Sequence, residues 1–152
     1  MATYTAEVVW TLKEGEDFAH GRYSRAHSLT FDGGVTVPAS ASPHVVGKWA
    51  DVSAVDPEEM LVAALSNCHM LTFLHKARLA GFIVTRYADH AEGVMAETAP
   101  GRLAMTKVWL KPDITWQGLA PTPAQLTALH HAAHDECYIA NSVRTEVVVA
   151  SS

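Results

Sequence analysis

The pattern of hydrophobic and polar residues divides the chain into short segments expected to be strands and two longer segments expected to be helices. In the first third, residues 3–10, 27–31 and 35–37 are rich in β-branched and aromatic residues and predict strands, with Asp32-Gly33-Gly34 as a hairpin connection. Residues 38–55 have no clear period and predict a long loop, of the kind that often belongs to a functional site. Further strands are predicted at residues 82–92, 94–97, 103–115 and 142–150.

The longest apolar stretch predicts a helix that begins after Asp56 and ends at Gly81. Asp56 suits the N-cap, Pro57 the first helical position and Glu59 the third, an arrangement that satisfies free backbone donors. Apolar residues cover most of the circumference of this helix, which predicts burial nearly all round. A chain with only one other long helix, at residues 124–136, can scarcely wrap such a segment, so we expect an obligate dimer.

The order of the elements is strands, helix, strands, helix, strand, which predicts an α+β fold with a mainly antiparallel sheet. The chain has 152 residues, of which 49% are hydrophobic and 18% charged, so it is long enough to bury a sizeable core. It contains no internal repeat and no long polar run. We therefore expect a single domain spanning residues 1–152.

The charge pattern and the termini bear on partners and location. A formal net charge of -5, with Lys and Arg scattered, leaves no basic stripe that could follow phosphates, which argues against nucleic acid binding. Residues 60–80 contain Asn67, Lys76 and Arg78, which an unpartnered membrane-spanning helix would not tolerate. The N-terminus lacks the basic start and apolar run of a signal peptide. We expect a cytoplasmic protein that acts on small molecules or proteins.

Two cysteines are the candidate reactive groups. Cys68 lies in the middle of the first helix beside Ser66, Asn67 and His69, and Cys137 lies at the end of the second helix. Each could be a small hydrophobe that fills the core, but buried polar groups need partners, so the neighbours of Cys68 favour a polar or reactive pocket. A reducing compartment keeps thiols free, so pairing would be catalytic or regulatory, with Cys68 as nucleophile and Cys137 as resolving thiol.

A metal site is the main alternative for the second helix. His130, His131, His134 and Cys137 lie within two helical turns, and residues three or four apart share a helix face. No further Cys- or His-rich segment completes a ligand set, apart from Cys68 with its neighbouring histidine. The simpler interpretation is that most of these histidines are surface or capping residues, and neither a metal nor a cofactor is predicted.

A thiol that attacks a peroxide needs a cation to hold the thiolate and the leaving oxygen, and an acceptor to hold the cation. The candidate cations are Arg22 and Arg25, and the candidate acid is Glu58, because Glu59 already serves the helix start. Glu58 and Cys68 are separated by roughly 15 Å along a straight helix, so they cannot touch. Either the arginine spans this gap, the first turn is displaced, or the site combines two chains.

Residues 56–70, Asp-Pro-Glu-Glu-Met-Leu-Val-Ala-Ala-Leu-Ser-Asn-Cys-His-Met, together with a second Cys about seventy residues on that leads into the last strand, resemble the OsmC and organic hydroperoxide resistance family. The resemblance spans nearly the whole chain. It implies an intertwined homodimer in which sheets wrap two central helices, with two active sites at the subunit interface. It also implies reduction of organic hydroperoxides, with electrons from a dithiol such as a lipoylated protein.

Carried over by position, the resemblance makes Cys68 the peroxidatic thiol, Cys137 the resolving thiol and Glu58 the carboxylate that holds the catalytic arginine. Arg25 is favoured over Arg22 for that arginine. Tyr138 follows the second cysteine where one branch of the family commonly has proline, and Ser66-Asn67 precede the first where small apolar residues are usual. The chain is therefore identified as a divergent OsmC-like member, for which a non-catalytic binder of a small hydrophobic ligand in the dimer cleft is the alternative function.

Overall fold

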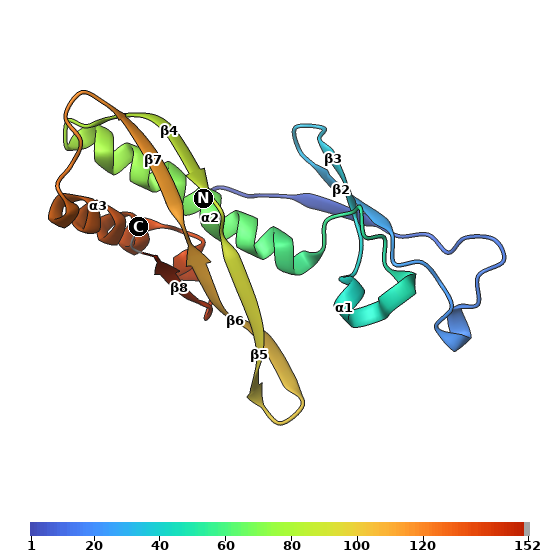
Figure 1. Cartoon of the computed structure of the whole chain (residues 1–152). Coiled ribbons are helices and arrows are strands. Elements are labelled where there is room, and N and C mark those ends of the chain that lie inside the picture. Colours follow the sequence, from blue (N-terminus) through green and yellow to red (C-terminus); the bar gives the residue numbers. More distant parts are fainter. Residues whose placement is uncertain (151–152) are drawn as a thin grey trace. The chain divides into compact units, whose positions relative to one another are not determined.

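The computed structural model describes residues 1–150, which form two compact units, one up to Met60 and one from Leu61 onwards. In the first unit, β1 (Ala6–Val9), β2 (His27–Phe31) and β3 (Thr36–Ala39) form an antiparallel sheet in that order (Figure 1). The Phe31 N–H donates to the carbonyl of Val35, so the hairpin loop consists of the three predicted residues, and Gly34 takes the left-handed conformation (φ 87°) that such a loop requires.

The predicted loop at residues 38–55 is more ordered than expected. It includes the end of β3, the short helix α1 (Pro43–Val46) and a 3-10 turn at Gly47–Trp49. Buried Ser40 ties the segment together, because its N–H donates to the carbonyl of Val55 and its hydroxyl accepts from the Asp51 N–H. Hydrogen bonds, not a periodic set of hydrophobic residues, order this segment. The hydrophobic pattern of the sequence therefore could not predict it.

Helix α2 (Pro57–Leu79) has the predicted N-terminal cap. Glu59 N–H donates to Asp56 Oδ1 over 2.8 Å, and the Asp56 N–H donates to Glu59 Oε2 over 3.0 Å. The buried residues of α2 form one stripe at four-residue spacing: Leu65, His69, Phe73 and Ala77. On another side the helix is open, and Leu71 is 60% exposed. One chain therefore does not wrap α2 completely, as expected from the sequence, and burial of the remaining face stays a prediction that depends on a partner.

The second unit contains two further sheets and a second long helix. Its elements are β4 (Ile83–Asp89), β5 (Glu92–Ala99), β6 (Arg102–Leu110), β7 (Pro112–Gln117), α3 (Pro123–Glu136) and β8 (Glu146–Val149). β4 pairs with β7, and β5 and β6 form a hairpin (Figure 1) whose second strand pairs with β8 in parallel. The other pairings between the named strands of residues 1–150 are antiparallel, so the α+β expectation with mainly antiparallel sheets is confirmed.

The single strand predicted at residues 103–115 is in fact two strands in different sheets. The chain leaves β6 at Lys111, whose N–H donates to Asp89 Oδ1 over 2.6 Å instead of to a neighbouring strand. Pro112 follows and has no N–H to continue the ladder. The hydrophobic alternation continues through this corner, so the sequence pattern did not reveal it.

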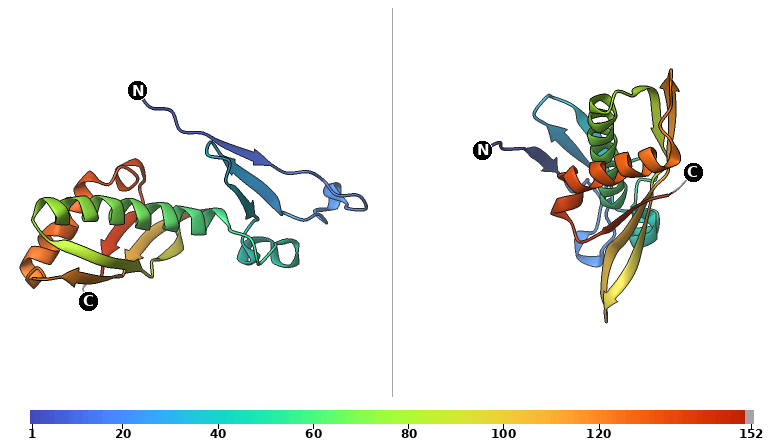
Figure 2. Two further views of the ribbon diagram at one scale, coloured as in Figure 1. Left: turned by 90° about the horizontal axis from the view of Figure 1, so that it is seen from above. Right: turned by 90° about the vertical axis from the view of Figure 1, so that its left-hand side faces the viewer.

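Helices α2 and α3 cross each other, as the right-hand view of Figure 2 shows, and two hydrophobic clusters lie around them. One consists of Phe73, Ala77, Leu129 and Ala133, where α3 packs on α2. The other consists of Leu65, Val108 and Leu110, where α2 packs on β6. None of the helices among residues 1–150 is both long and apolar enough to cross a membrane.

Gly93 allows β5 to approach α2 closely, and this contact gives a test of the packing. A Cβ at this position would lie 2.5 Å from Met105 Cε and 2.7 Å from Val62 Cγ2. We expect Gly93→Ala to lower the free energy of unfolding by about 1–3 kcal/mol in urea denaturation, because the neighbours must shift. Gly33→Ala is the matched control, since nothing lies within 4 Å of its Cβ position. A Gly93→Ala variant as stable as this control would contradict the described contact.

Candidate active site

The two cysteines lie against each other where the C-terminal end of α3 meets the middle of α2. The thiol of Cys137 donates a hydrogen bond to Cys68 Sγ, and the two sulfurs are 2.8 Å apart. Both cysteines are free. A disulfide requires a sulfur separation of about 2.05 Å, so a small displacement would join the two residues. The predicted pair is thus assembled within one chain, although sixty-nine positions separate its members.

Cys137 is held more firmly than its position at a helix end suggested. The residue is 1% exposed, and it forms the C-cap of α3 with its N–H directed to the carbonyl of His134. Its sulfur accepts a hydrogen bond from the Ala140 N–H over 3.4 Å. Burial raises the pKa of the Cys137 thiol to about 11, and the hydrogen bond to Cys68 is the second largest cause. Cys137 is therefore a protonated hydrogen-bond donor at neutral pH.

The polar residues beside Cys68 each have their own partner. Ser66 donates to Asp89 Oδ2 over 2.5 Å, which joins α2 to the end of β4. The exposed side chain of Asn67 donates to the carbonyl of Ala63 within the same helix. His69 is directed into the protein and is 1% exposed. The polar cluster in the sequence is therefore distributed around the helix, and only Cys68 itself faces the second cysteine.

His69 forms a buried pair with His130 of α3. Its Nε2 lies 3.0 Å from His130 Nδ1, and the rings are stacked with their planes 13° apart. Burial lowers the pKa of each imidazole to about 4. Both rings are consequently neutral at pH 7, and one nitrogen of the pair must donate while the other accepts.

Aromatic packing surrounds this pair and leaves buried polar atoms without partners. The Phe73 ring lies 4.4 Å from the His130 ring and 5.6 Å from the Tyr87 ring, measured between centroids. Burial raises the pKa of Tyr87, so its phenol stays protonated. Among residues 1–150, the Tyr87 hydroxyl, His69 Nδ1 and His134 Nδ1 are buried with no hydrogen-bond partner. Such atoms are rare in folded proteins and mark places where a further group can bind.

The two candidate arginines lie in the first unit and differ in burial and in the contacts that hold their side chains. Arg25 is half-buried: its guanidinium donates to the carbonyl of Tyr23 and stacks 3.5 Å above that ring. Arg22 is exposed, and its N–H and carbonyl pair with Asp17. A stacked, partly buried guanidinium is pre-positioned for an anion, which an exposed one is not.

Glu58 lies in the first turn of α2, still in the first unit. Its Oε2 atom is buried and has no hydrogen-bond partner among the described residues. No ion pair joins it to Arg25 or Arg22 within residues 1–150. A buried carboxylate oxygen without a donor is costly, which fits a residue that receives a cation.

The structure does not assemble the metal set considered from the sequence. No group of three or more His, Cys, Asp or Glu side chains within residues 1–150 is placed to hold a metal ion. His131 is exposed and lies 3.7 Å from Asp135, as expected for a surface residue. His130 is buried, so it is an exception to the interpretation that most of these histidines are surface or capping residues.

His130 and Asp89 were not identified as site residues from the sequence. His130 lies on the face of α3 that also carries Leu126, Leu129, Ala133 and Cys137, so helical spacing could have revealed its burial. No local signal marks Asp89, because its two partners come from α2 and from the corner after β6.

Comparison with known proteins relates this arrangement to one family. The family model for OsmC-like proteins matches residues 50–152. An OsmC-like protein of unknown function from Vibrio cholerae has a TM-score of 0.94 and 47% sequence identity, over 99% of each chain. The search of curated proteins found no match.

Two more distant structures share the fold. An organic hydroperoxide resistance protein OsmC from Legionella pneumophila has a TM-score of 0.69 and 21% identity, over 98% of this chain and 94% of its own. An organic hydroperoxide resistance protein from Elizabethkingia anophelis has a TM-score of 0.69 and 19% identity, over 98% and 93% of the two chains.

The buried histidine pair predicts acid sensitivity. Because the pKa values of His69 and His130 are lower in the folded than in the unfolded protein, the unfolded chain binds more protons as the pH falls below 6.5. Between pH 6.5 and 5, before most carboxylates titrate, the free energy of unfolding should fall by about 1.5 kcal/mol for each histidine. Urea titrations across this range measure it. His131→Gln, which removes an exposed histidine, should keep the same slope, and a flat wild-type profile would contradict a neutral buried pair.

Proposed function

The chain belongs to the OsmC-like family, and on that premise we propose that it is a thiol-dependent peroxidase that reduces organic hydroperoxides. The observation that carries the proposal is the 2.8 Å contact between the sulfurs of Cys68 and Cys137. The names of structural neighbours from L. pneumophila and E. anophelis, which are organic hydroperoxide resistance proteins, support the substrate class.

In the first step Cys68 acts as the nucleophile. Its thiolate attacks the terminal oxygen of the hydroperoxide, an S–O bond forms and the O–O bond breaks. The alkoxide leaves as an alcohol after taking a proton, and the sulfur becomes a sulfenic acid. Cys68 suits this role because it is the partly exposed member of the pair, whereas Cys137 is buried.

In the second step Cys137 resolves the sulfenic acid. Its sulfur attacks Cys68 Sγ, the S–S bond forms, and the oxygen leaves as water with the proton of Cys137. In the resting protein this proton already points from Cys137 toward the sulfur of Cys68. A dithiol such as a lipoylated protein then reduces the disulfide by exchange and becomes a disulfide itself.

The cation for the first step is Arg25, held by the carboxylate of Glu58. Arg25 is stacked on Tyr23, and Glu58 has a buried oxygen without a donor. Glu58 lies roughly 15 Å along the helix from Cys68 of its own chain. We therefore infer that Arg25 and Glu58 serve the thiol of a second copy in a homodimer, which would also cover the exposed face of α2 around Leu71.

The thiol chemistry is tested by comparing two serine variants. Cys68→Ser should lower the rate of cumene hydroperoxide reduction by about a thousandfold or more, because it removes the nucleophile. Cys137→Ser should still consume one equivalent of peroxide as Cys68 becomes a sulfenic acid, and a second equivalent where this is oxidised further to sulfinic acid, measured by mass spectrometry. In the wild type one equivalent should yield a Cys68–Cys137 disulfide. A Cys68→Ser variant with wild-type activity would refute the mechanism.

The arginine and the shared site are tested together. Arg25→Ala should lower kcat/KM by about a hundredfold without changing the melting temperature, and Arg22→Ala should change kcat/KM by less than about twofold. Co-expressed Arg25→Ala and Cys68→Ser chains should regain activity, because each mixed dimer would contain one site with both residues intact. Random pairing would restore about a quarter of the wild-type sites.

The outcome separates the alternatives. If the arginine acts within its own chain, mixing restores nothing. If Arg22→Ala gives the large loss instead, the assignment of the cation is wrong. Light scattering on the mixed sample measures whether dimers form at all.

A further inference from the structure

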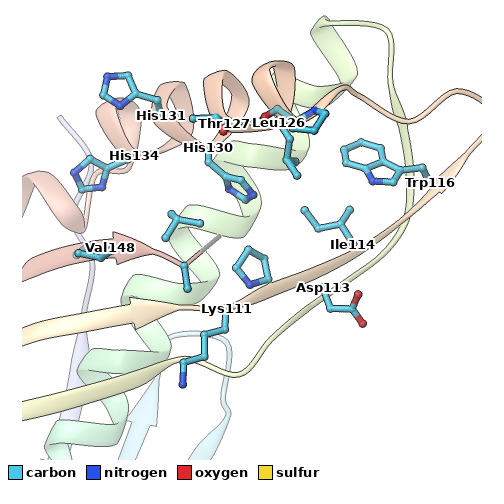
Figure 3. A pocket seen from close by; sticks show the side chains of 15 residues that line it. Lys111, Asp113, Ile114, Trp116, Leu126, Thr127, His130, His131, His134 and Val148 are labelled. Carbon is cyan, nitrogen blue, oxygen red and sulfur yellow. Dashed lines mark hydrogen bonds between the residues drawn. The ribbon is translucent and has the colours of Figure 1, made fainter. Parts of the chain in front are cut away.

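A cavity of about 830 Å³ opens in the second unit between α3, β7 and β8 (Figure 3). Neither cysteine lines it. Its walls are mainly apolar, and the side chains that form them include Ile114, Trp116, Leu126, Val147 and Val149. A cavity of this size and character is typical of sites that enclose a small organic molecule.

One nearly buried polar side chain is directed into this cavity. His130 is 9% exposed, and Figure 3 shows its ring pointing from α3 into the space between that helix and β7. Its Nδ1 is occupied by His69. Its Nε2 has no hydrogen-bond partner among the described residues. His134, one turn further along α3, also lines the cavity, and its Nδ1 is buried without a partner.

The histidine pair determines which proton His130 presents. If His130 Nδ1 donated to His69 Nε2, the proton of neutral His69 would be on Nδ1, which is buried and has no partner. A buried N–H without an acceptor is rarer than an unused acceptor. The favoured arrangement is therefore that His69 Nε2–H donates to His130 Nδ1. His130 then carries its own proton on Nε2, as a donor facing the cavity.

The charged residues at the cavity edge are already paired. Lys111 lies 2.6 Å from Glu92, and Asp113 lies 3.3 Å from Arg86. In Figure 3 the side chains of Lys111 and Asp113 point away from His130. Among the described residues that line it, the cavity thus presents a neutral donor and no unpaired Lys or Arg, and an anion buried there would lack a counter-charge.

We propose that this cavity binds a neutral, mainly apolar molecule with one hydrogen-bond acceptor, such as a ketone or an ester. The acceptor takes the proton of His130 Nε2, and the hydrocarbon part lies along Ile114, Trp116 and Leu126. The site is separate from the thiol pair and does not depend on peroxidase activity.

Binding is tested with octan-2-one and octanoate, which have the same chain length and differ in the charge of the polar end. Isothermal titration of the purified protein should show octan-2-one binding at least about tenfold more tightly than octanoate. Thr127→Trp places an indole at the cavity mouth and should weaken octan-2-one binding by about tenfold or more. Ala128→Trp is the matched control, because this exposed neighbour on α3 does not line the cavity, and it should leave binding unchanged.

Ring nitrogen chemical shifts from NMR test the donor directly. They should show a neutral His130 with its proton on Nε2, and adding octan-2-one should shift that nitrogen. The proposal is overturned if octan-2-one does not bind. This would be the result if a second copy of the chain filled the cavity. It is also overturned if octanoate binds as tightly, if Thr127→Trp and Ala128→Trp behave alike, or if the proton of His130 is on Nδ1.

Discussion

The crossing of α2 and α3 is the contact on which the proposed thiol chemistry depends. At this crossing, neighbouring residues of α2 reach two different partners on α3: Cys68 meets Cys137, and His69 meets His130. Packing of Phe73 and Ala77 against Leu129 and Ala133 holds the helices together. Because protein interiors are close-packed, a shift of either helix would change both polar contacts at once.

Burial at this crossing sets the protonation of the groups involved. A low-dielectric environment disfavours the charged form of any side chain, so it keeps Cys137 protonated and both histidines neutral. Cys137 can therefore donate its proton to the sulfur or oxygen that it meets. The same effect leaves His130, about two turns back along the same face of α3, as a neutral donor. One physical cause thus sets the protonation of both groups.

The exposed face of α2, and the Glu58 oxygen that has no partner within residues 1–150, are the two features that the proposed homodimer would explain. Burying the exposed side chain of Leu71 in an interface would stabilise the assembly by about 2 kcal/mol. A cation that reached the buried carboxylate of Glu58 would likewise offset the cost of burying its oxygen without a donor. A second copy would satisfy both requirements, which links assembly to the positioning of the arginine in the proposed mechanism.

Local chemistry in the sequence determined the long helix, its cap at Asp56 and Glu59, the second helix and most strands, and it singled out the two cysteines as candidates. These features depend on neighbours within a few positions, so period, capping and turn residues reveal them. The corner at Pro112, the pairing of His130 with His69 and the role of Asp89 depend on partners more than twenty positions away. Only the tertiary structure decided those, because hydrophobic alternation says that a residue is buried but not what it is buried against. The same holds for the thiol pair: the sequence supplied two cysteines sixty-nine positions apart, and the packing of α3 on α2 brought their sulfurs together.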